Sequence, residues 1–389
     1  MIDMKRLECL DGLRGLLAVY VMLSHMAPFA VLPDGLGYGW FHPGWLPRVL
    51  SHGGAAVDIF FILSGLVILR SLDGLSYRVR PFLWARVLRI FPAFLLVFAF
   101  AVAVQPLETD FARMPWIGAA SPARDIWSGG WPTGWLGSIA AHLTMTHGLF
   151  PNAVQPDIWV GFLGAAWSLS VEWQFYGLIM LVAGPGREWK MAGGLLGLAM
   201  VALVWATLVP ASWRFSPAFL PNKAHFFALG IASAALLGDR LPGRARLMRF
   251  AAVLGVTMAI CLPGGIGKIA APLIWTLCLA AQMQAVSWLA PLSALLRARI
   301  LLWLGAVSFC LYLVNEPVQK LLGLALARLA DGDAGWFTLF WVPLATLLPI
   351  VFAWWLHHAI EQPALRWGKQ RNRWAARAPD YSRTNATLP

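Results

Sequence analysis

Apolar segments of membrane-spanning length follow one another along almost the whole chain of 389 residues. A helix that crosses the hydrocarbon core of a bilayer needs about 20 mainly apolar residues. Because backbone polar groups in lipid must be satisfied within the segment, such runs predict helices. The sequence therefore predicts an all-α polytopic membrane protein with about ten transmembrane helices. They are expected at residues 10–31, 55–70, 82–105, 165–184, 190–209, 222–238, 249–264, 268–289, 300–327 and 336–360.

The charge content agrees with a membrane protein. Only 12% of the residues are charged, with a formal net charge of +12, whereas a typical soluble domain has about 25% charged residues. A positive balance can indicate nucleic-acid binding, but here the bases lie in short loops between apolar runs. That pattern sets membrane topology. With both termini in the cytoplasm, cytoplasmic segments hold about three times as many Lys and Arg as the outer ones.

Three stretches lie outside the predicted spans. Residues 106–164 are rich in Gly, Pro and Trp and are expected to form a structured outer cap. Within them, residues 134–150 are apolar but contain two histidines, and we expect a re-entrant or interfacial helix there. Residues 1–365 would form one membrane domain, and residues 366–389 a loose, basic cytoplasmic tail. The first apolar run is expected to be a retained span, because it lacks a clear signal-cleavage site.

The first span carries two ionisable residues, Arg14 and His25, with ten residues between them. Ionisable residues within a span usually face the protein interior and mark candidate functional sites. A rise of about 1.5 Å per residue separates the two by roughly 16 Å along nearly the same helix face. On position alone, His25 would more often be a buried, hydrogen-bonded histidine than a catalyst.

Two carboxylates are expected at the depth of His25. Asp58 lies near the outer end of the second span, and Glu172 lies in the outer half of the fourth. A histidine with a nearby carboxylate is the minimal general-base unit, because the carboxylate selects the tautomer and stabilises the imidazolium. Asp58 could equally cap its helix, and Glu172 could pair with a structural arginine.

Arginines form a second group near the cytoplasmic surface. Arg86 and Arg89 are three residues apart on the third span and hence on one helix face. With Arg14 at the same depth, they could bind a phosphate group through their planar guanidinium forks. Snorkelling and topology alone explain the nearby Arg78 and Arg80 well.

Other polar residues in the spans are candidates for substrate binding or solvation. The paired His357 and His358 show no Cys or carboxylate at metal-ligand spacing, and the four cysteines show no paired spacing. We therefore expect no metal site. The candidate substrate-binding residues are Trp167, Ser168, Tyr312, Asn315 and Glu316.

Six motifs in order resemble those of acyltransferase family 3, which comprises bacterial integral-membrane acyltransferases of surface glycans. The resemblance runs over residues 7–367 and implies a stand-alone form, without the fused C-terminal hydrolase-like domain of some members. The motifs are LDGLRGLLAVYVMLSH, GGAAVDIFFILSGLVI, ARVLRIFPAF, AWSLSVEWQFYG, GAVSFCLYLVNEPV and IEQPALRW.

The resemblance implies a ten-span enzyme that takes an acyl group, usually acetyl, from cytoplasmic acyl-CoA and passes it to an acceptor hydroxyl. The family's essential Arg and His fall on Arg14 and His25, its arginine pair on Arg86 and Arg89, and its WSLSVE glutamate on Glu172.

Two positions depart from the family pattern. Many members have Glu where this chain has Trp173, and many have His where it has Asn315. A role in proton transfer at position 315 is therefore in doubt, although Asn315 could still hydrogen-bond substrate.

The leading hypothesis is an O-acyltransferase of the bacterial inner membrane. It would use acyl-CoA, with acetyl-CoA expected, as donor and a hydroxyl of a surface polysaccharide, glycolipid or related molecule as acceptor. His25 would be the general base, supported by Asp58 or Glu172, and a homo-oligomer is compatible with the sequence. The main alternative is a proton-coupled permease or flippase for a glycan or lipid intermediate, although such proteins often show internal repeats. A third interpretation, a structural subunit of a polysaccharide-export complex, would leave the buried charges unexplained.

Overall fold

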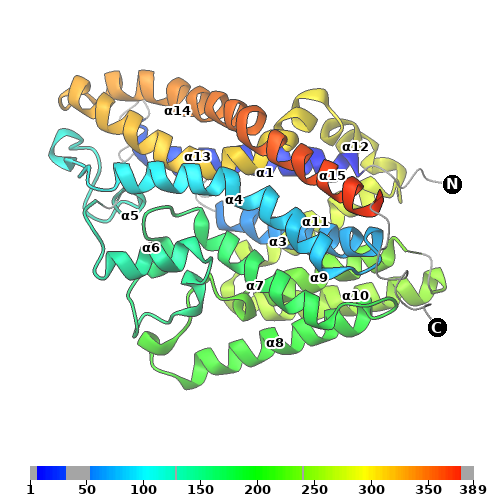
Figure 1. Cartoon of the computed structure of the whole chain (residues 1–389). Helices are drawn as coiled ribbons and strands as arrows, with labels where there is room; N and C mark the ends of the chain where they lie inside the picture. Colours follow the sequence, from blue (N-terminus) through cyan, green and yellow to red (C-terminus); the bar gives the residue numbers. More distant parts are fainter. Residues whose placement is uncertain (1–6, 32–52, 128, 239–240, 378–389) are drawn as a thin grey trace, which may run out of the picture.

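The computed structural model describes residues 7–31, 53–127, 129–238 and 241–377, and within them the chain is helical without β-strands. Figure 1 shows the long helices running side by side in one bundle, with α15 ending where α1 begins. The principal helices are α1 (Glu8–Met26), α3 (Gly53–Gly74), α4 (Val79–Val104), α7 (Ala166–Val182), α8 (Glu188–Leu208), α9 (Ala224–Leu236), α10 (Gly243–Cys261), α11 (Ile266–Gln282), α12 (Ala290–Leu296), α13 (Arg299–Ala330), α14 (Ala334–Leu356) and α15 (Gln362–Arg377).

Each of the ten predicted spans coincides with a helix, so the all-α polytopic architecture is confirmed. The number of membrane-spanning helices differs from the sequence-based prediction. Among the described residues, seven helices are long and apolar enough to cross a membrane, and the bent pair of α11 and α12 would make an eighth. The helices α7 and α9 have only 17 and 13 residues. The count of ten is therefore not confirmed.

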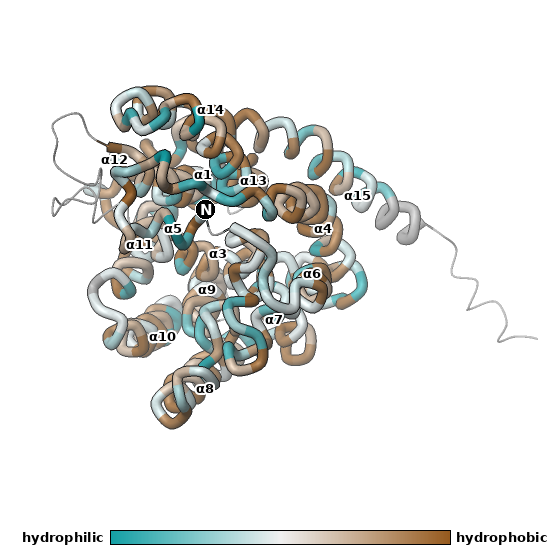
Figure 2. Tube along the Cα trace, turned by 90° about the vertical axis from the view of Figure 1, so that its left-hand side faces the viewer, coloured by the Kyte–Doolittle hydropathy of each residue, from teal (hydrophilic) through white to brown (hydrophobic). Residues whose placement is uncertain are grey.

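The outer helices present apolar surface. Figure 2 looks along the bundle and shows hydrophobic segments on α4, α8 and α14. Among the exposed large apolar side chains are Val201 and Leu208 on α8 and Leu339 and Leu347 on α14. A soluble bundle would bury such residues, whereas a bilayer solvates them. The surface thus agrees with insertion in a membrane.

Helix α1 lies against α13 with the two backbones in close approach. A Cβ atom at Gly15 would collide with the backbone of Leu301 and Gly305, and one at Gly305 would collide with that of Asp11. Small residues allow membrane helices to pack this closely. Gly15, the residue after Arg14, and Gly305 therefore allow α1 to pack closely against α13.

Residues 106–164 contain only short helical elements, at the end of the bundle where α1 ends (Figure 1). The apolar stretch 134–150 forms the nine-residue helix α6 (Trp135–Leu143) followed by the 3-10 turn η4 (His147–Leu149). Nine residues are too few to cross a bilayer, so this stretch is not a full span. The other elements of this segment are η3 (Phe111–Arg113), α5 (Ala123–Ile126) and η5 (Ile158–Val160).

The two histidines of this stretch stack on each other, with ring centroids 4.1 Å apart. His142 hydrogen-bonds the Ser138 carbonyl and His147 the Ala166 carbonyl. Burial lowers the pKa of His142 to about 4 and that of His147 to about 3. Both rings are therefore neutral near pH 7 and act as packing elements.

The C-terminal region is more ordered than the sequence suggested. Helix α14 continues through a π-helical segment, η10 (His357–Glu361), into α15, which reaches Arg377. The predicted loose tail from residue 366 is therefore wrong over residues 366–377, which are helical. The amphipathic pattern of this segment, with Trp367 packed near Trp84 at 5.9 Å between ring centroids, gives the physical reason. Residues 378–389 lie outside the described part of the chain.

Candidate active site

Three arginines from two helices line one small cavity of about 100 Å³, here called the arginine cavity. Arg14 comes from α1, whereas Arg86 and Arg89 come from α4. The predicted grouping of these three residues is present in the structure. The wall of the arginine cavity also includes Val57, Phe60, Phe61, Ser64, Ser168, Glu172, Tyr176, Ser308 and Tyr312.

The guanidinium groups are only partly neutralised by their surroundings. Arg86 donates to the Ser71 hydroxyl at 2.9 Å, and its Nε is buried without a hydrogen-bond partner among the described residues. Arg14 approaches Asp11 one helical turn away, with 3.5 Å between Nη1 and Oδ1. A buried polar group without a partner is costly. The cavity is therefore suited to an anionic ligand that would satisfy these donors.

Glu172 faces the arginine cavity. Its carboxylate accepts hydrogen bonds from the hydroxyl of Ser64 on α3 and, at 3.0 Å, from the hydroxyl of Tyr176. The expectation that Glu172 lies beside His25 is therefore corrected. The fourth span enters the bundle beside α3 and α4, and this packing turns the carboxylate toward Arg14 and Arg86 as a counter-charge.

His25 lies on a second and larger cavity of about 910 Å³, here called the histidine cavity. The cavity is bounded by α1, α3, α4, α7 and α13, and by segments from residues 122–132 and 156–165. Arg14 and His25 are thus on one continuous helix, as predicted, but open into different cavities. The polar and aromatic residues on the wall of the histidine cavity include Arg124, Asp125, Trp131, Asp157, Trp159, Trp167, Glu316 and Lys320.

The two cavities share two wall residues. Val57 of α3 and Tyr312 of α13 line both of them. The two cavities are therefore adjacent, with Val57 and Tyr312 between them. This boundary is here called the junction.

The hydrogen-bond partner of His25 is an amide. Nδ1 of His25 lies 2.8 Å from Oδ1 of Asn315, which is fully buried on α13. Glu316 lines the same cavity. Its carboxylate packs against the backbone at Gly164, where an added Cβ atom would lie only 2.5 Å from it. The sequence placed Asn315 among substrate-binding candidates, but in the structure it contacts the histidine.

Asp58 is paired away from His25. Its carboxylate is fully buried and accepts from Nζ of Lys223 at 2.6 Å and from Nζ of Lys268 at 3.1 Å. It does not cap α3 either, because that helix begins at Gly53. The expectation that Asp58 supports His25 is therefore corrected. The two lysines come from distant segments, so no spacing in the sequence could reveal this pairing.

The remaining candidates divide between the cavities. Trp167 lines the histidine cavity, where Trp159 packs near it with ring centroids 6.3 Å apart. Ser168, the next residue, lines the arginine cavity. Adjacent residues of α7 therefore contribute to the two sides of the junction, since successive side chains on a helix point in different directions.

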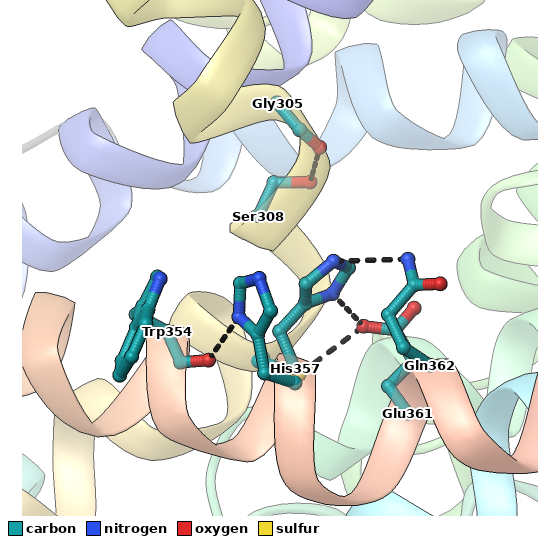
Figure 3. A network of polar contacts seen from close by, with 8 residues as sticks. Gly305, Ser308, Trp354, His357, Glu361 and Gln362 are labelled. Atoms are coloured by element: carbon teal, nitrogen blue, oxygen red, sulfur yellow. Dashed lines mark hydrogen bonds and ion pairs between the residues drawn. The ribbon is translucent and has the colours of Figure 1, made fainter.

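A buried cluster of Cys310, His357 and Glu361 was missed in the sequence. The carboxylate of Glu361 accepts from the Cys310 thiol at 3.3 Å and from Nδ1 of His357 at 2.7 Å, and Figure 3 shows His357 and Glu361 pointing toward each other. The amide of Gln362 lies 3.1 Å from the other nitrogen of His357. The i,i+4 spacing of the histidine and the glutamate was a usable signal, but only the fold brings Cys310 to them.

This cluster has ligand types that could hold a metal ion, contrary to the sequence reading that His357 lacks suitable neighbours. The three candidate ligand atoms lie within 4.8 Å of one another. However, they already hydrogen-bond one another, and none of the three residues lines either cavity. A zinc ion with three protein ligands needs a fourth, commonly water. A buried structural network is the simpler interpretation.

Comparison with known proteins agrees with the motifs. Residues 7–358 match the family model described as an acyltransferase domain, Acyl_transf_3. The chain is also similar to a protein named acyltransferase MdmB from Streptomyces mycarofaciens, with 28% identity over 96% of this chain and 95% of that protein. No solved structure matches the chain. The chain therefore belongs to acyltransferase family 3 and is a multi-pass membrane protein.

Proposed function

We propose that this acyltransferase moves an acyl group, which we take to be acetyl, from acyl-CoA to a hydroxyl of a surface polysaccharide, glycolipid or related acceptor. One observation carries the proposal: an arginine-lined cavity and a histidine-lined cavity meet at Val57 and Tyr312. This arrangement provides separate places for an anionic donor and a hydroxyl acceptor, with a candidate base on the acceptor side.

The donor side is supported by the arginine chemistry. Guanidinium groups bind phosphate through paired N–H donors, and Nε of Arg86 is buried without a partner in the described structure. The cavity of about 100 Å³ is smaller than the roughly 300–1,000 Å³ of typical ligand sites. Binding of an acyl-CoA therefore requires the surrounding helices to separate, with the phosphates near the arginines and the acyl end at Tyr312.

The acceptor side is supported by the volume and wall of the histidine cavity. Its volume of about 910 Å³ falls in the range of ligand sites. Trp159 and Trp167 offer flat apolar faces, whereas Asp125 and Asp157 offer acceptors for hydroxyl protons. Such a combination suits a sugar, which has apolar ring faces and many hydroxyl groups.

In the proposed reaction, a ring nitrogen of His25 accepts the proton of the acceptor hydroxyl. The hydroxyl oxygen forms a bond to the thioester carbonyl carbon, and the bond from that carbon to sulfur breaks. The CoA thiolate then receives the proton from the imidazolium. An acyl-histidine relay is the other order of events. The same nitrogen first bonds to the carbonyl carbon while the C–S bond breaks and the CoA thiolate leaves; the acceptor oxygen then bonds to that carbon while the C–N bond breaks, and the freed nitrogen takes the hydroxyl proton.

We further propose that the chain lies in a bacterial inner membrane with both termini in the cytoplasm. The basic residues of its loops follow the positive-inside rule for this orientation. Helix α15 also ends at the end of the bundle where α1 begins (Figure 1). In this orientation the arginine cavity lies toward the cytoplasm, where acyl-CoA is available.

The direct test uses the full chain purified in detergent and reconstituted in vesicles. We expect binding of acetyl-CoA and release of free thiol when lipid-linked glycans from a bacterial membrane are supplied. Mass spectrometry should then find an added acetyl group on the acceptor. Proton-coupled flux without thiol release or acetylated product would contradict the enzyme proposal and favour the permease alternative.

A further inference from the structure

The amide of Asn315 is the feature that determines how His25 presents its ring. Nδ2 of Asn315 donates one hydrogen to the Leu311 carbonyl at 3.1 Å and the other to the Tyr312 carbonyl at 2.7 Å. Oδ1 points in the other direction and lies 2.8 Å from Nδ1 of His25. All three contacts are made by a side chain with no solvent exposure.

This pattern determines the orientation of the amide. If the amide were flipped, its oxygen would face two carbonyl oxygens and both of its hydrogens would lose these acceptors. Backbone carbonyl oxygens cannot donate, so the flipped arrangement is excluded by the local donor and acceptor count. The atom that faces His25 is therefore an acceptor, and Nδ1 must carry the hydrogen.

We propose that Asn315 is a positioning residue that holds His25 in the tautomer with a hydrogen on Nδ1, which leaves the lone pair on Nε2. The inference deepens the proposed function, because it names Nε2 as the nitrogen that takes the proton or the acyl group. His25 lines the histidine cavity, and its hydrogen bond to a described residue is at Nδ1. The orienting role that a carboxylate plays beside many catalytic histidines is here given to a neutral amide.

The neutral partner has a chemical consequence. A carboxylate would stabilise the imidazolium and keep His25 protonated to higher pH, whereas an amide selects the tautomer without a full negative charge. The other charged groups on the wall are Glu316 and Lys320 of α13, Arg124 and Asp125 of α5, and Asp157 before η5. They are the same in every variant below, so a change in pH dependence reports on position 315.

The first experiment measures the tautomer without any substrate. The full chain, with its eight histidines labelled with ¹⁵N, is reconstituted in lipid, and the His25 signals are identified by their loss in His25→Gln. At a pH where the ring is neutral, we expect a protonated Nδ1 and an unprotonated Nε2. A hydrogen on Nε2 would overturn the proposal.

The second experiment measures the pH dependence of acetyl transfer. In Asn315→Asp, the carboxylate still accepts from Nδ1 but stabilises the imidazolium, so the acid limb should move up by about one pH unit or more. In Asn315→Leu, the tautomer is no longer selected, and kcat should fall about tenfold with KM for the donor unchanged. A purely structural role for Asn315 would not move the acid limb.

Gln282→Glu is the matched control, because it also replaces a buried amide oxygen that accepts a hydrogen bond, there from the backbone N–H of Cys9. Its pH profile should equal that of the unmodified chain. If Asn315→Asp leaves the acid limb in place, Asn315 does not position the base. If instead His25→Gln retains full transfer, the proposed role of His25 fails, and the tautomer measurement still decides the part played by Asn315.

Discussion

The arginine cavity and the histidine cavity are built in different ways. The arginine cavity is small and is lined by residues of helices, with its three cations coming from α1 and α4. The histidine cavity is about nine times larger, at about 910 against about 100 Å³, and segments from residues 122–132 and 156–165 form part of its wall. Packing between long helices thus leaves a small cavity, whereas the segments between helices enclose a larger one.

The largest effect is expected from His25→Gln, which removes the proposed base from the histidine cavity. We expect the rate of acetyl transfer to fall by about 100-fold or more, while acetyl-CoA binding stays unchanged. The measurement is thiol release together with a donor-binding isotherm. His358→Gln is the control, because His358 is an exposed histidine on the same chain. Equal activity of the His25 and His358 variants would show that His25 is not the base and would contradict the proposed role of the histidine cavity.

The matching change in the arginine cavity is Arg86→Met, which keeps an unbranched apolar stem and removes the guanidinium and its charge. We expect the donor Kd to rise by about 10- to 100-fold, since hydrogen bonds to charged groups contribute more than neutral ones. The KM for the acceptor should not change. Arg80→Met is the control on the same helix, because Arg80 is exposed. A rise in acceptor KM instead would show that the donor does not use the arginine cavity.

In the structure, Asp58 neither supports His25 nor caps α3, and the variant Asp58→Asn tests this placement. Loss of its charge leaves buried Lys223 without its counter-ion, so the chain should lose about 3 kcal/mol of stability. The melting temperature in detergent should fall, while transfer per folded molecule is retained. If transfer fell as much as in His25→Gln and the melting temperature did not change, Asp58 would have a role in the reaction at His25.

The smallest effect is expected from Trp159→Ala on the wall of the histidine cavity. Loss of one aromatic face should raise the acceptor KM by up to about tenfold, with the donor KM unchanged. Steady-state kinetics with each substrate varied in turn separates the two constants. Trp213→Ala, at an exposed tryptophan outside the cavity, should leave both unchanged. A change in donor KM alone would contradict the assignment of this wall to the acceptor.

Several parts of the site could be predicted because they depend on spacing along one helix. Arg14 and His25 are on α1, and Arg86 and Arg89 are on α4, as their positions in apolar runs predicted. The partners of the carboxylates could not be predicted. Depth in the membrane placed Asp58, Glu172 and His25 at one level, but depth does not say in which direction a side chain points around its helix axis.

The loops set a second limit on prediction. Residues 106–164 were expected to form a structured cap, but nothing in their composition indicated which of them would face a cavity. Trp131 and Trp159 lie on the wall of the histidine cavity together with residues of α1, α3, α4, α7 and α13. Such contacts join positions far apart in the chain and depend on how the loops close over the bundle.

The sequence alone determined the helical membrane architecture, because hydrocarbon excludes unpaired backbone groups and leaves a hydropathy pattern of long apolar runs. It also determined that Arg14 and His25 lie at different heights on one helix. Only the tertiary structure decided that Asn315 is the partner of His25, that Glu172 faces the arginines, and that Lys223 neutralises Asp58. Hydrogen bonds and ion pairs are short and directional, so they are set by how the helices rotate and pack against one another.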